Sequence, residues 1–279
     1  MKRSKKKQIV IVGAGLIGSV MAIALASKGF DVTVVDGAKH SDRVERNKGR
    51  TYALSRTSKN LLFNLGLWDP KKLNVSPIKN IVLSTKKDSN DSICHLAEFN
   101  EESSSIDPSS YMIEDFYLRN MLASEINKNK KIQLLDSSEV IQDETNSFET
   151  KIMLSDKSSI RAEILIISDG RNSGFAKRLN KRFFSKSYNQ VAIVGNLSHD
   201  NAHNFTAHQI FLSGGPLAIL PLQGKRSTFV WSLPVEIGKK ISDSKREKFI
   251  NHLMDNAGDI LSNPSLVGEK KIFPLYLRF

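Results

Sequence analysis

The feature that most constrains the fold is an uncharged, apolar stretch over residues 9–26, close to the N-terminus. It follows the basic segment MKRSKKK and therefore resembles an export signal, with the tripeptide ALA at 24–26 imitating a cleavage site. It also approaches the ~20 apolar residues that span a bilayer. The same stretch divides equally well into a short β-branched strand, residues 8–12, followed by GAGLIG. A membrane or export signal and the start of a nucleotide-binding fold therefore compete for these residues.

The spacing of three glycines favours the nucleotide-binding fold. In this G-x-G-x-x-G pattern, Gly13 permits a tight turn, Gly15 lets the backbone approach a pyrophosphate, and Gly18 lets a helix pack on the strand. A helix follows, and a second strand over residues 31–35 ends at Asp36. A carboxylate at that place can hydrogen-bond a ribose hydroxyl. An export signal needs none of these residues, so we interpret the segment as a dinucleotide-binding βαβ unit.

The charge of the chain is concentrated at its N-terminal end. The chain of 279 residues carries a net charge of +12, but residues 1–60 hold 13 Lys/Arg against 4 Asp/Glu and the remainder 28 against 25. The basic tail is either a solvated extension or an electrostatic contact with anionic lipid. Aromatic residues are not interleaved with it, so we expect no nucleic-acid partner. The single cysteine, Cys94, excludes an internal disulfide and fits a reducing compartment. We expect a cytoplasmic chain, with peripheral attachment to the inner face of a membrane.

A second apolar run, ILIIS at residues 164–168, ends in Asp169-Gly170. Ligands of open α/β sheets bind beyond the carboxyl ends of the strands, and GAGLIG and SDGRNS both stand at such ends. Residues 37–49 read as a charged loop, residues 113–127 and 242–261 as helices, and the chain after Tyr188 as alternating strands.

These elements predict an α/β fold in which a Rossmann-like FAD/NAD(P)-binding domain is interwoven with a smaller, mainly antiparallel β (α+β) domain. We expect residues 1–75 and 111–182 in the cofactor domain. Residues 76–110 and 183–279 are expected in the substrate domain.

Four blocks together resemble the flavin-dependent aromatic hydroxylases, in particular their ubiquinone-biosynthesis branch. They are VIVGAGLIGSVMAIALASKGFDVTVVD, GRTYALSRTSKNLLFNLGLW, ILIISDGRNS, and HQIFLSGGPLAILPL with FVWSLP downstream. The resemblance implies an FAD-dependent monooxygenase with NAD(P)H as electron donor. Its reduced flavin would react with molecular oxygen to a hydroperoxide that hydroxylates a prenylated phenol, a quinone precursor. It also allows contacts with a membrane surface and with other quinone-biosynthesis proteins.

The resemblance also assigns residues. The glycine-rich loop would cradle the FAD pyrophosphate, the acid would bind the adenosine ribose, two arginines would lie against the cofactor, and the Asp-Gly pair would serve FAD and the nicotinamide cofactor. The expected cofactor-binding residues are Gly13, Ala14, Gly15, Gly18, Asp36, Arg50, Arg119, Asp169 and Gly170. The expected substrate residues are His208, Phe211 and Pro216, and we name no catalytic acid–base pair. His199, His203 and His208 are not expected to bind a metal, because no Cys or Glu completes a ligand set.

Two departures from the family pattern matter. Ala176 stands where the family has an arginine after its Asp-Gly motif, with Lys177 and Arg178 next to it. The sequence also stops at FPLYLRF, where the family continues into a Gly-Asp block. We therefore expect a truncated chain, and the alternative function is a non-catalytic nucleotide-fold protein that acts as a binding or assembly partner in a quinone-synthesis complex.

Overall fold

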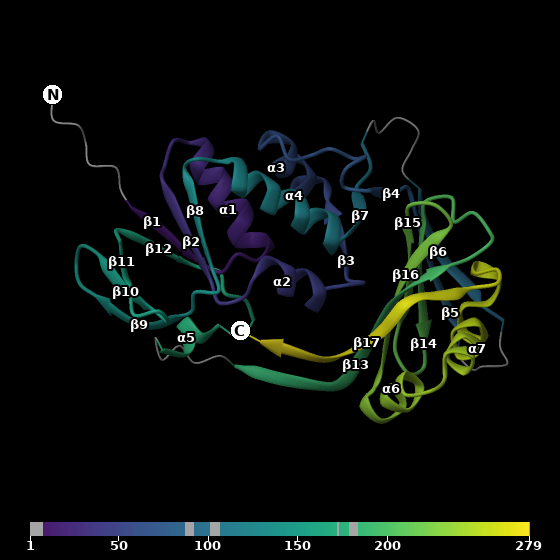
Figure 1. Cartoon of the computed structure of the whole chain (residues 1–279). Helices are drawn as coiled ribbons and strands as arrows, with labels where there is room; N and C mark the ends of the chain where they lie inside the picture. Colours follow the sequence, from purple (N-terminus) through teal and green to yellow (C-terminus); the bar gives the residue numbers. More distant parts are fainter. Residues whose placement is uncertain (1–7, 87–91, 101–106, 172, 179–183, 279) are drawn as a thin grey trace. The chain divides into compact units, whose positions relative to one another are not determined.

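The computed structural model describes residues 8–86, 92–100, 107–171, 173–178 and 184–278, and it divides into two compact units (Figure 1). The first unit comprises residues 1–48, 61–72 and 116–182, and the second comprises residues 49–60, 73–115 and 183–279. Neither unit is continuous in sequence, as expected for interwoven domains. The predicted assignment of one domain to the cofactor and the other to the substrate remains a prediction.

The first unit is built on a four-stranded parallel sheet with the strand order β12–β1–β2–β8. Its strands are β1 (Ile9–Val12), β2 (Val32–Asp36), β8 (Ile132–Asp136) and β12 (Ile164–Ile167). The two inner strands, β1 and β2, are buried along almost their whole length, which explains their unbroken β-branched sequences. The predicted parallel core of a Rossmann-like domain is thus confirmed.

Both faces of this sheet are covered. Helix α1 (Leu16–Ser27) contacts β1, β2 and β8. An antiparallel sheet of three strands contributes to a core on Val10, Val12 and Val35 through side chains that include Ile152 and Leu154. Its strands are β9 (Val140–Thr145), β10 (Thr150–Leu154) and β11 (Ser159–Ala162). The remaining helices of this unit are α2 (His40–Arg46), α4 (Asp115–Lys128, from Phe116 on) and α5 (Gly174–Arg178).

The second unit contains a seven-stranded sheet with the order β17–β13–β16–β15–β14–β5–β6, antiparallel except for the β14–β5 pair. Its strands are β5 (Asn80–Lys86), β6 (Cys94–Asn100), β13 (Ser185–Ser198), β14 (Thr206–Leu212), β15 (Leu217–Leu222), β16 (Arg226–Pro234) and β17 (Ser265–Arg278). A smaller sheet joins β3 (Thr51–Ser55), β7 (Ser110–Glu114) and β4 (Ser76–Ile78). The predicted mainly antiparallel domain is confirmed.

Helices complete the second unit. Phe249 and Leu253 of α7 (Arg246–Ala257) pack against Ile193, Ile219 and Trp231 in a core on one face of the large sheet. The other helices are α6 (Val235–Ser242) and α3 (Arg56–Asn64), and α3 continues into residues of the first unit. None of the helices in the described ranges combines the length and hydropathy needed to cross a bilayer.

Three local predictions are wrong. The segment 37–49 is not all loop, because it forms α2. The expected helix 242–261 begins later, at Arg246, and a separate helix, α6, precedes it. Ile113 belongs to β7 rather than to the following helix, because its backbone pairs with Tyr52 in the small sheet.

Candidate functional site

A cavity of about 690 Å³ opens in the first unit, and its walls include residues at the carboxyl ends of β1, β2 and β12. This is the position at which open α/β sheets bind their ligands, and the volume lies in the usual range for ligand pockets. The lining residues include Gly13, Gly15, Asp36, Arg119, Asp169 and Gly170 from the sequence-based expectation. They also include Arg43, Arg46, Asn47 and Phe175, which the sequence analysis does not assign to the site, and Arg178, which it names as a cation next to Ala176.

The turn between β1 and α1 explains each glycine of the motif. Gly13 has a positive φ of 106°, and a Cβ there would overlap the carbonyl of Ser168. A Cβ on Gly18 would overlap the carbonyl oxygen of Gly13, so this glycine permits the close packing of helix and turn. Gly15 differs from both, because a Cβ there would meet no atom within 4 Å. Packing within the described chain therefore does not require glycine at this position.

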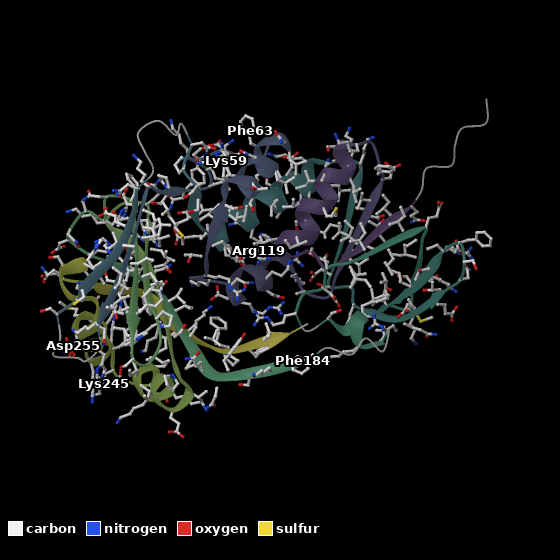
Figure 2. The ribbon with its side chains drawn as sticks, turned by 180° about the vertical axis from the view of Figure 1, so that it is seen from behind. Lys59, Phe63, Arg119, Phe184, Lys245 and Asp255 are labelled. Atoms are coloured by element: carbon white, nitrogen blue, oxygen red, sulfur yellow. The ribbon has the colours of Figure 1, made fainter. Side chains whose placement is uncertain are left out.

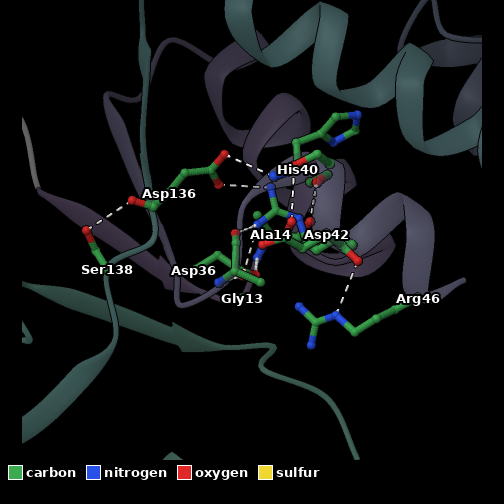
Figure 3. Close-up of polar contacts among 12 residues, drawn as sticks. Gly13, Ala14, Asp36, His40, Asp42, Arg46, Asp136 and Ser138 are labelled. Carbon is green, nitrogen blue, oxygen red and sulfur yellow. Dashed lines mark hydrogen bonds and ion pairs between the residues drawn. The ribbon is translucent and has the colours of Figure 1, made fainter.

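Asp36 is tied to the glycine-rich loop (Figure 3). Its Oδ2 accepts a hydrogen bond of 2.7 Å from the backbone N–H of Ala14. Its Oδ1 accepts one of 2.8 Å from Ala38 and forms an ion pair of 2.9 Å with Arg43. The end of β2 and the turn after β1 therefore form one connected wall of the cavity.

Arg43 is the main residue that sequence reasoning missed. Its guanidinium also lies 2.9 Å from Asp136 at the end of β8 and donates to the Ala38 carbonyl. The charged composition of residues 37–49 predicts a loop, whereas the structure forms α2 there. The signal that was available is a run of residues without glycine or proline between Gly37 and Gly49, which a helix tolerates.

The Asp-Gly turn after β12 forms another wall. Gly170 has a positive φ of 88°, and Asp169 Oδ2 accepts a hydrogen bond of 3.2 Å from the Phe175 N–H. Asp169 Oδ1 is buried and has no hydrogen-bond partner among the described residues. A buried acceptor left unpaired is costly, so this oxygen fits a donor supplied by a ligand.

Arg178 stands on α5 beside the position where the family pattern has an arginine. Its Nε donates to Asp143 Oδ1 at 3.1 Å, and its guanidinium lies 4.8 Å from the centroid of the Phe175 ring. It lines the cavity, so a cation is present on this wall although residue 176 is alanine.

The two arginines expected at the cofactor are placed differently. Arg119 comes from α4, is only 8% exposed and lines the cavity (Figure 2). Arg50 belongs to the second unit and is not among the lining residues. Its guanidinium lies 5.5 Å from the centroid of the Phe273 ring, and its carbonyl accepts a 2.9 Å hydrogen bond from the Asp115 N–H. The cofactor role of Arg50 stays a prediction.

The expected substrate residues do not share one surface. His208 and Phe211 are three residues apart on β14, so they point to opposite faces of the sheet. His208 lines a separate cavity of about 300 Å³, with Glu98 nearby, and burial lowers the pKa of its imidazole. Phe211 is exposed, and the carbonyl of Pro216 accepts a 2.9 Å hydrogen bond from Ser232. Their substrate roles remain predictions. Ile210 pairs with Leu217, so Phe211 and Pro216 are neighbours at the ends of β14 and β15, whereas His208 lies elsewhere.

Two histidines of the same cavity use both ring nitrogens. The nitrogens of His199 lie 2.9 Å from the Asn201 carbonyl and from the Ser227 hydroxyl. Those of His203 contact the Leu222 carbonyl at 2.7 Å and the Phe205 N–H at 3.0 Å. Within the described ranges, no three His, Cys, Asp or Glu side chains are arranged to hold a metal ion.

The residues of the large cavity fit a dinucleotide such as FAD. The N-terminus of α1 supplies backbone N–H groups and a positive dipole end, which suit a diphosphate. Four arginines, Arg43, Arg46, Arg119 and Arg178, line the same space as Asp36 and the unpaired oxygen of Asp169. The donor and acceptor sets therefore match a diphosphate joined to hydroxyl-bearing groups.

Comparisons with known proteins agree with this fit. The chain is 29% identical over 275 residues to the ubiquinone hydroxylase UbiL of Rhodospirillum rubrum, an alignment that covers 98% of this chain and 63% of UbiL. It is 26% identical to the 3-demethoxyubiquinol 3-hydroxylase of Escherichia coli, covering 80% of this chain and 56% of that enzyme. The chain thus spans less than two thirds of the length of these relatives.

The fold recurs in solved structures. The crystal structure of PqsL from Pseudomonas aeruginosa in complex with 2-aminobenzoylacetate matches with a TM-score of 0.80 at 19% identity, covering 96% of this chain and 73% of PqsL. A family model described as "FAD binding domain" matches residues 6–273. The protein therefore belongs to the FAD-binding-domain family.

Proposed function

We propose that this chain provides the FAD-binding and substrate-binding units of a monooxygenase that hydroxylates a prenylated phenol in ubiquinone biosynthesis. The observation that carries the proposal is the 690 Å³ cavity in which the glycine-rich loop is tied to Asp36 through the Ala14 N–H. The names of the relatives, a ubiquinone hydroxylase and a 3-demethoxyubiquinol 3-hydroxylase, support the reaction class and the pathway.

In this proposal each wall of the cavity has one task. The first N–H groups of α1, reached past the open Cβ position of Gly15, bind the diphosphate. Asp36 accepts a hydrogen bond from the adenosine ribose, and Arg119 balances the negative charge of the cofactor. Asp169 Oδ1 accepts a hydrogen bond from a hydroxyl of the bound group, which pairs the buried oxygen.

When bound, FAD supplies the activation of molecular oxygen, which no amino-acid side chain can perform. The protein binds and orients the ring to be hydroxylated and excludes water from the reacting atoms. The exposed side chain of Phe211, beside the segment of Pro216, is our candidate for contact with the apolar prenyl tail.

FAD binding is the first test. Titration of the purified chain with FAD should quench flavin fluorescence to a saturating value, and Asp36→Ala should weaken binding while riboflavin, which lacks the diphosphate and adenosine, binds little to either protein. Flavin fluorescence that stays unchanged during the titration would contradict the proposed function.

The electron donor is the second part of the proposal. We assign this role to NAD(P)H, with Arg178 as the cation on the Asp-Gly wall. Oxidation of NADPH and NADH by the FAD-loaded chain would be followed by absorbance, with Arg178→Met compared against Lys177→Met. Equal rates in the two variants would contradict the role of Arg178.

Membrane contact is the third part. The basic residues of the segment MKRSKKK support an electrostatic contact with anionic lipid. Sedimentation with vesicles containing phosphatidylglycerol should retain the chain at low salt, and replacing these lysines and arginine by glutamine should abolish retention. Neutral phosphatidylcholine vesicles serve as control.

A further inference from the structure

Arg43 is a charged side chain in an unusual place. It is only 7% exposed, although burial of a cation is costly unless the cation is paired, and its Nε has no hydrogen-bond partner among the described residues. Its guanidinium contacts the carboxylates of Asp36 and Asp136, each at 2.9 Å. These two acids are register partners on the adjacent parallel strands β2 and β8. Neighbouring strands lie about 4.8 Å apart, so Arg43 offsets the repulsion between two nearby negative charges.

The contacts of Asp36 leave a defined acceptor free. A carboxylate offers about four lone-pair positions, two on each oxygen. Oδ1 accepts from the Ala38 N–H and from Arg43, whereas within the described residues Oδ2 accepts from the Ala14 N–H alone. Asp36 lines the cavity, so the position left on Oδ2 is available to a ligand hydroxyl.

The second carboxylate in contact with Arg43, that of Asp136, lies outside the cavity. Asp136 is not among the lining residues, and its Oδ2 accepts a weaker hydrogen bond of 3.3 Å from the His40 N–H at the start of α2. Among the described residues, the printed contacts of the Asp136 carboxylate are with Arg43 and with the start of α2, so a change of this carboxylate acts on a ligand indirectly. This separates a positioning effect from a direct contact.

We propose that Arg43 is a positioning residue for the adenosine half of the cofactor. It holds the Asp36 carboxylate in the orientation in which Oδ2 accepts a hydrogen bond from a ribose hydroxyl, and Asp136 holds Arg43. The proposal rests on the FAD-binding function proposed above and adds the residues that set its selectivity for a ribose.

The test compares two probes, ADP and 2′,3′-dideoxy-ADP, by calorimetric titration of the wild-type chain and its variants. A hydrogen bond to a charged acceptor predicts that the wild type binds ADP about tenfold more tightly than the dideoxy compound. Arg43→Met should lose this preference and bind both probes alike. Arg43→Lys should retain only part of it, because a single ammonium nitrogen replaces the two guanidinium nitrogens that contact Asp36 and Asp136 separately.

Asp136→Asn is the second variant, and it keeps Arg43 and Asp36 in place. It should reduce the preference for ADP without removing any group that lines the cavity. Lys48→Met is the matched control, because Lys48 is an exposed cation just after α2 whose ion pair, within the described residues, is with Glu45. The preference of this variant for ADP should equal that of the wild type.

The outcomes separate the two proposals. A wild type that binds neither FAD nor ADP overturns the proposed function. A wild type that binds FAD but does not discriminate between the probes overturns the inference alone. The inference is also overturned if Arg43→Met and Asp136→Asn both keep the wild-type preference for ADP. An equal loss of affinity for both probes would overturn it too, because a purely structural role of Arg43 would not depend on the ribose hydroxyls.

Discussion

Gly15 and Gly18 offer a direct separation of ligand binding from folding, because the same substitution should act differently at each. At Gly15 the backbone has φ −68° and a Cβ meets no atom within 4 Å. Gly15→Ala loses a favourable N-cap residue, at a cost of about 0.5–1 kcal/mol, and regains about 0.4–1 kcal/mol from the reduced freedom of the unfolded chain. The free energy of unfolding should therefore change by less than about 0.5 kcal/mol.

Gly18→Ala should instead destabilise the chain before any ligand is added. Its Cβ would overlap the backbone carbonyl of Gly13, which cannot rotate away as a side chain could. Overpacking costs about 3 kcal/mol at the upper end of its usual range, and the better helix propensity of alanine returns about 1 kcal/mol. A net loss of about 2 kcal/mol corresponds to a decrease of about 4–8 °C in Tm.

Gly18→Ala should have the larger effect on stability, whereas Gly15→Ala should have the larger effect on FAD affinity. The methyl group of Gly15→Ala would occupy the space through which a diphosphate reaches the start of α1. Loss of one or two hydrogen bonds to a charged group, about 3 kcal/mol, weakens FAD binding about 100-fold. Urea denaturation without FAD and fluorescence titration with FAD measure the two effects. Undiminished FAD affinity in Gly15→Ala would refute the assignment of the cavity, and a large loss of stability in this variant would refute its open Cβ position.

Three further predictions concern the second unit. Burial lowers the pKa of His208 below 6.5, so the unfolded chain binds this proton first as the pH falls. The free energy of unfolding should therefore decrease below about pH 6.5, and less steeply in His208→Gln than in the wild type. Identical pH dependences of the two proteins would contradict this. Burial and then Asp115 raise the pKa of Tyr52 above 10.0, and its hydroxyl donates to Asp115 at 2.7 Å. Tyr52→Phe should lower the free energy of unfolding by about 1–3 kcal/mol and remove a late-ionising tyrosine from an ultraviolet titration, whereas an unchanged titration would assign the late group elsewhere. Arg226 contacts both oxygens of Glu114, at 2.8 and 3.1 Å; Arg226→Met should cost about 2 kcal/mol in urea denaturation, and the double variant with Glu114→Gln should cost less than the sum of the single changes unless the pair is uncoupled.

The parts of the site that could be predicted are those encoded locally. Gly13 and Gly18 are required by the chain's own turn, and Asp36 follows within the same βαβ unit, so one short motif specified one connected wall of the cavity. The placement of Arg43 could not be found in this way, because its side chain is held by Asp136, which is 93 residues away. A local pattern carries no information about such a partner.

In the fold, too, local features could be predicted from the sequence, whereas contacts between distant segments could not. Residues 76–86 form two consecutive strands, β4 and β5, which belong to different sheets. β5 pairs in parallel with β14, and Thr85 bonds to Phe211 across 126 positions of sequence. The run at 164–168 does form a strand beside β1, but it is the edge of its sheet and Ile164 is 41% exposed rather than buried. Alternation of side chains predicts strands, whereas the choice of neighbour depends on the rest of the chain.

The pairing of β1 with β12 has a consequence for folding during translation. The Ser168 hydroxyl bonds to the carbonyls of Val12 and Gly13 across 156 and 155 residues, so the first strand made receives its second neighbour late in synthesis. At about 5–20 residues per second, the apolar opening segment waits roughly 8–30 s for that neighbour. During this interval β1 can pair with β2 but not with β12. Slower translation between β2 and β12 therefore lengthens the time for which β1 has only one neighbour in its sheet.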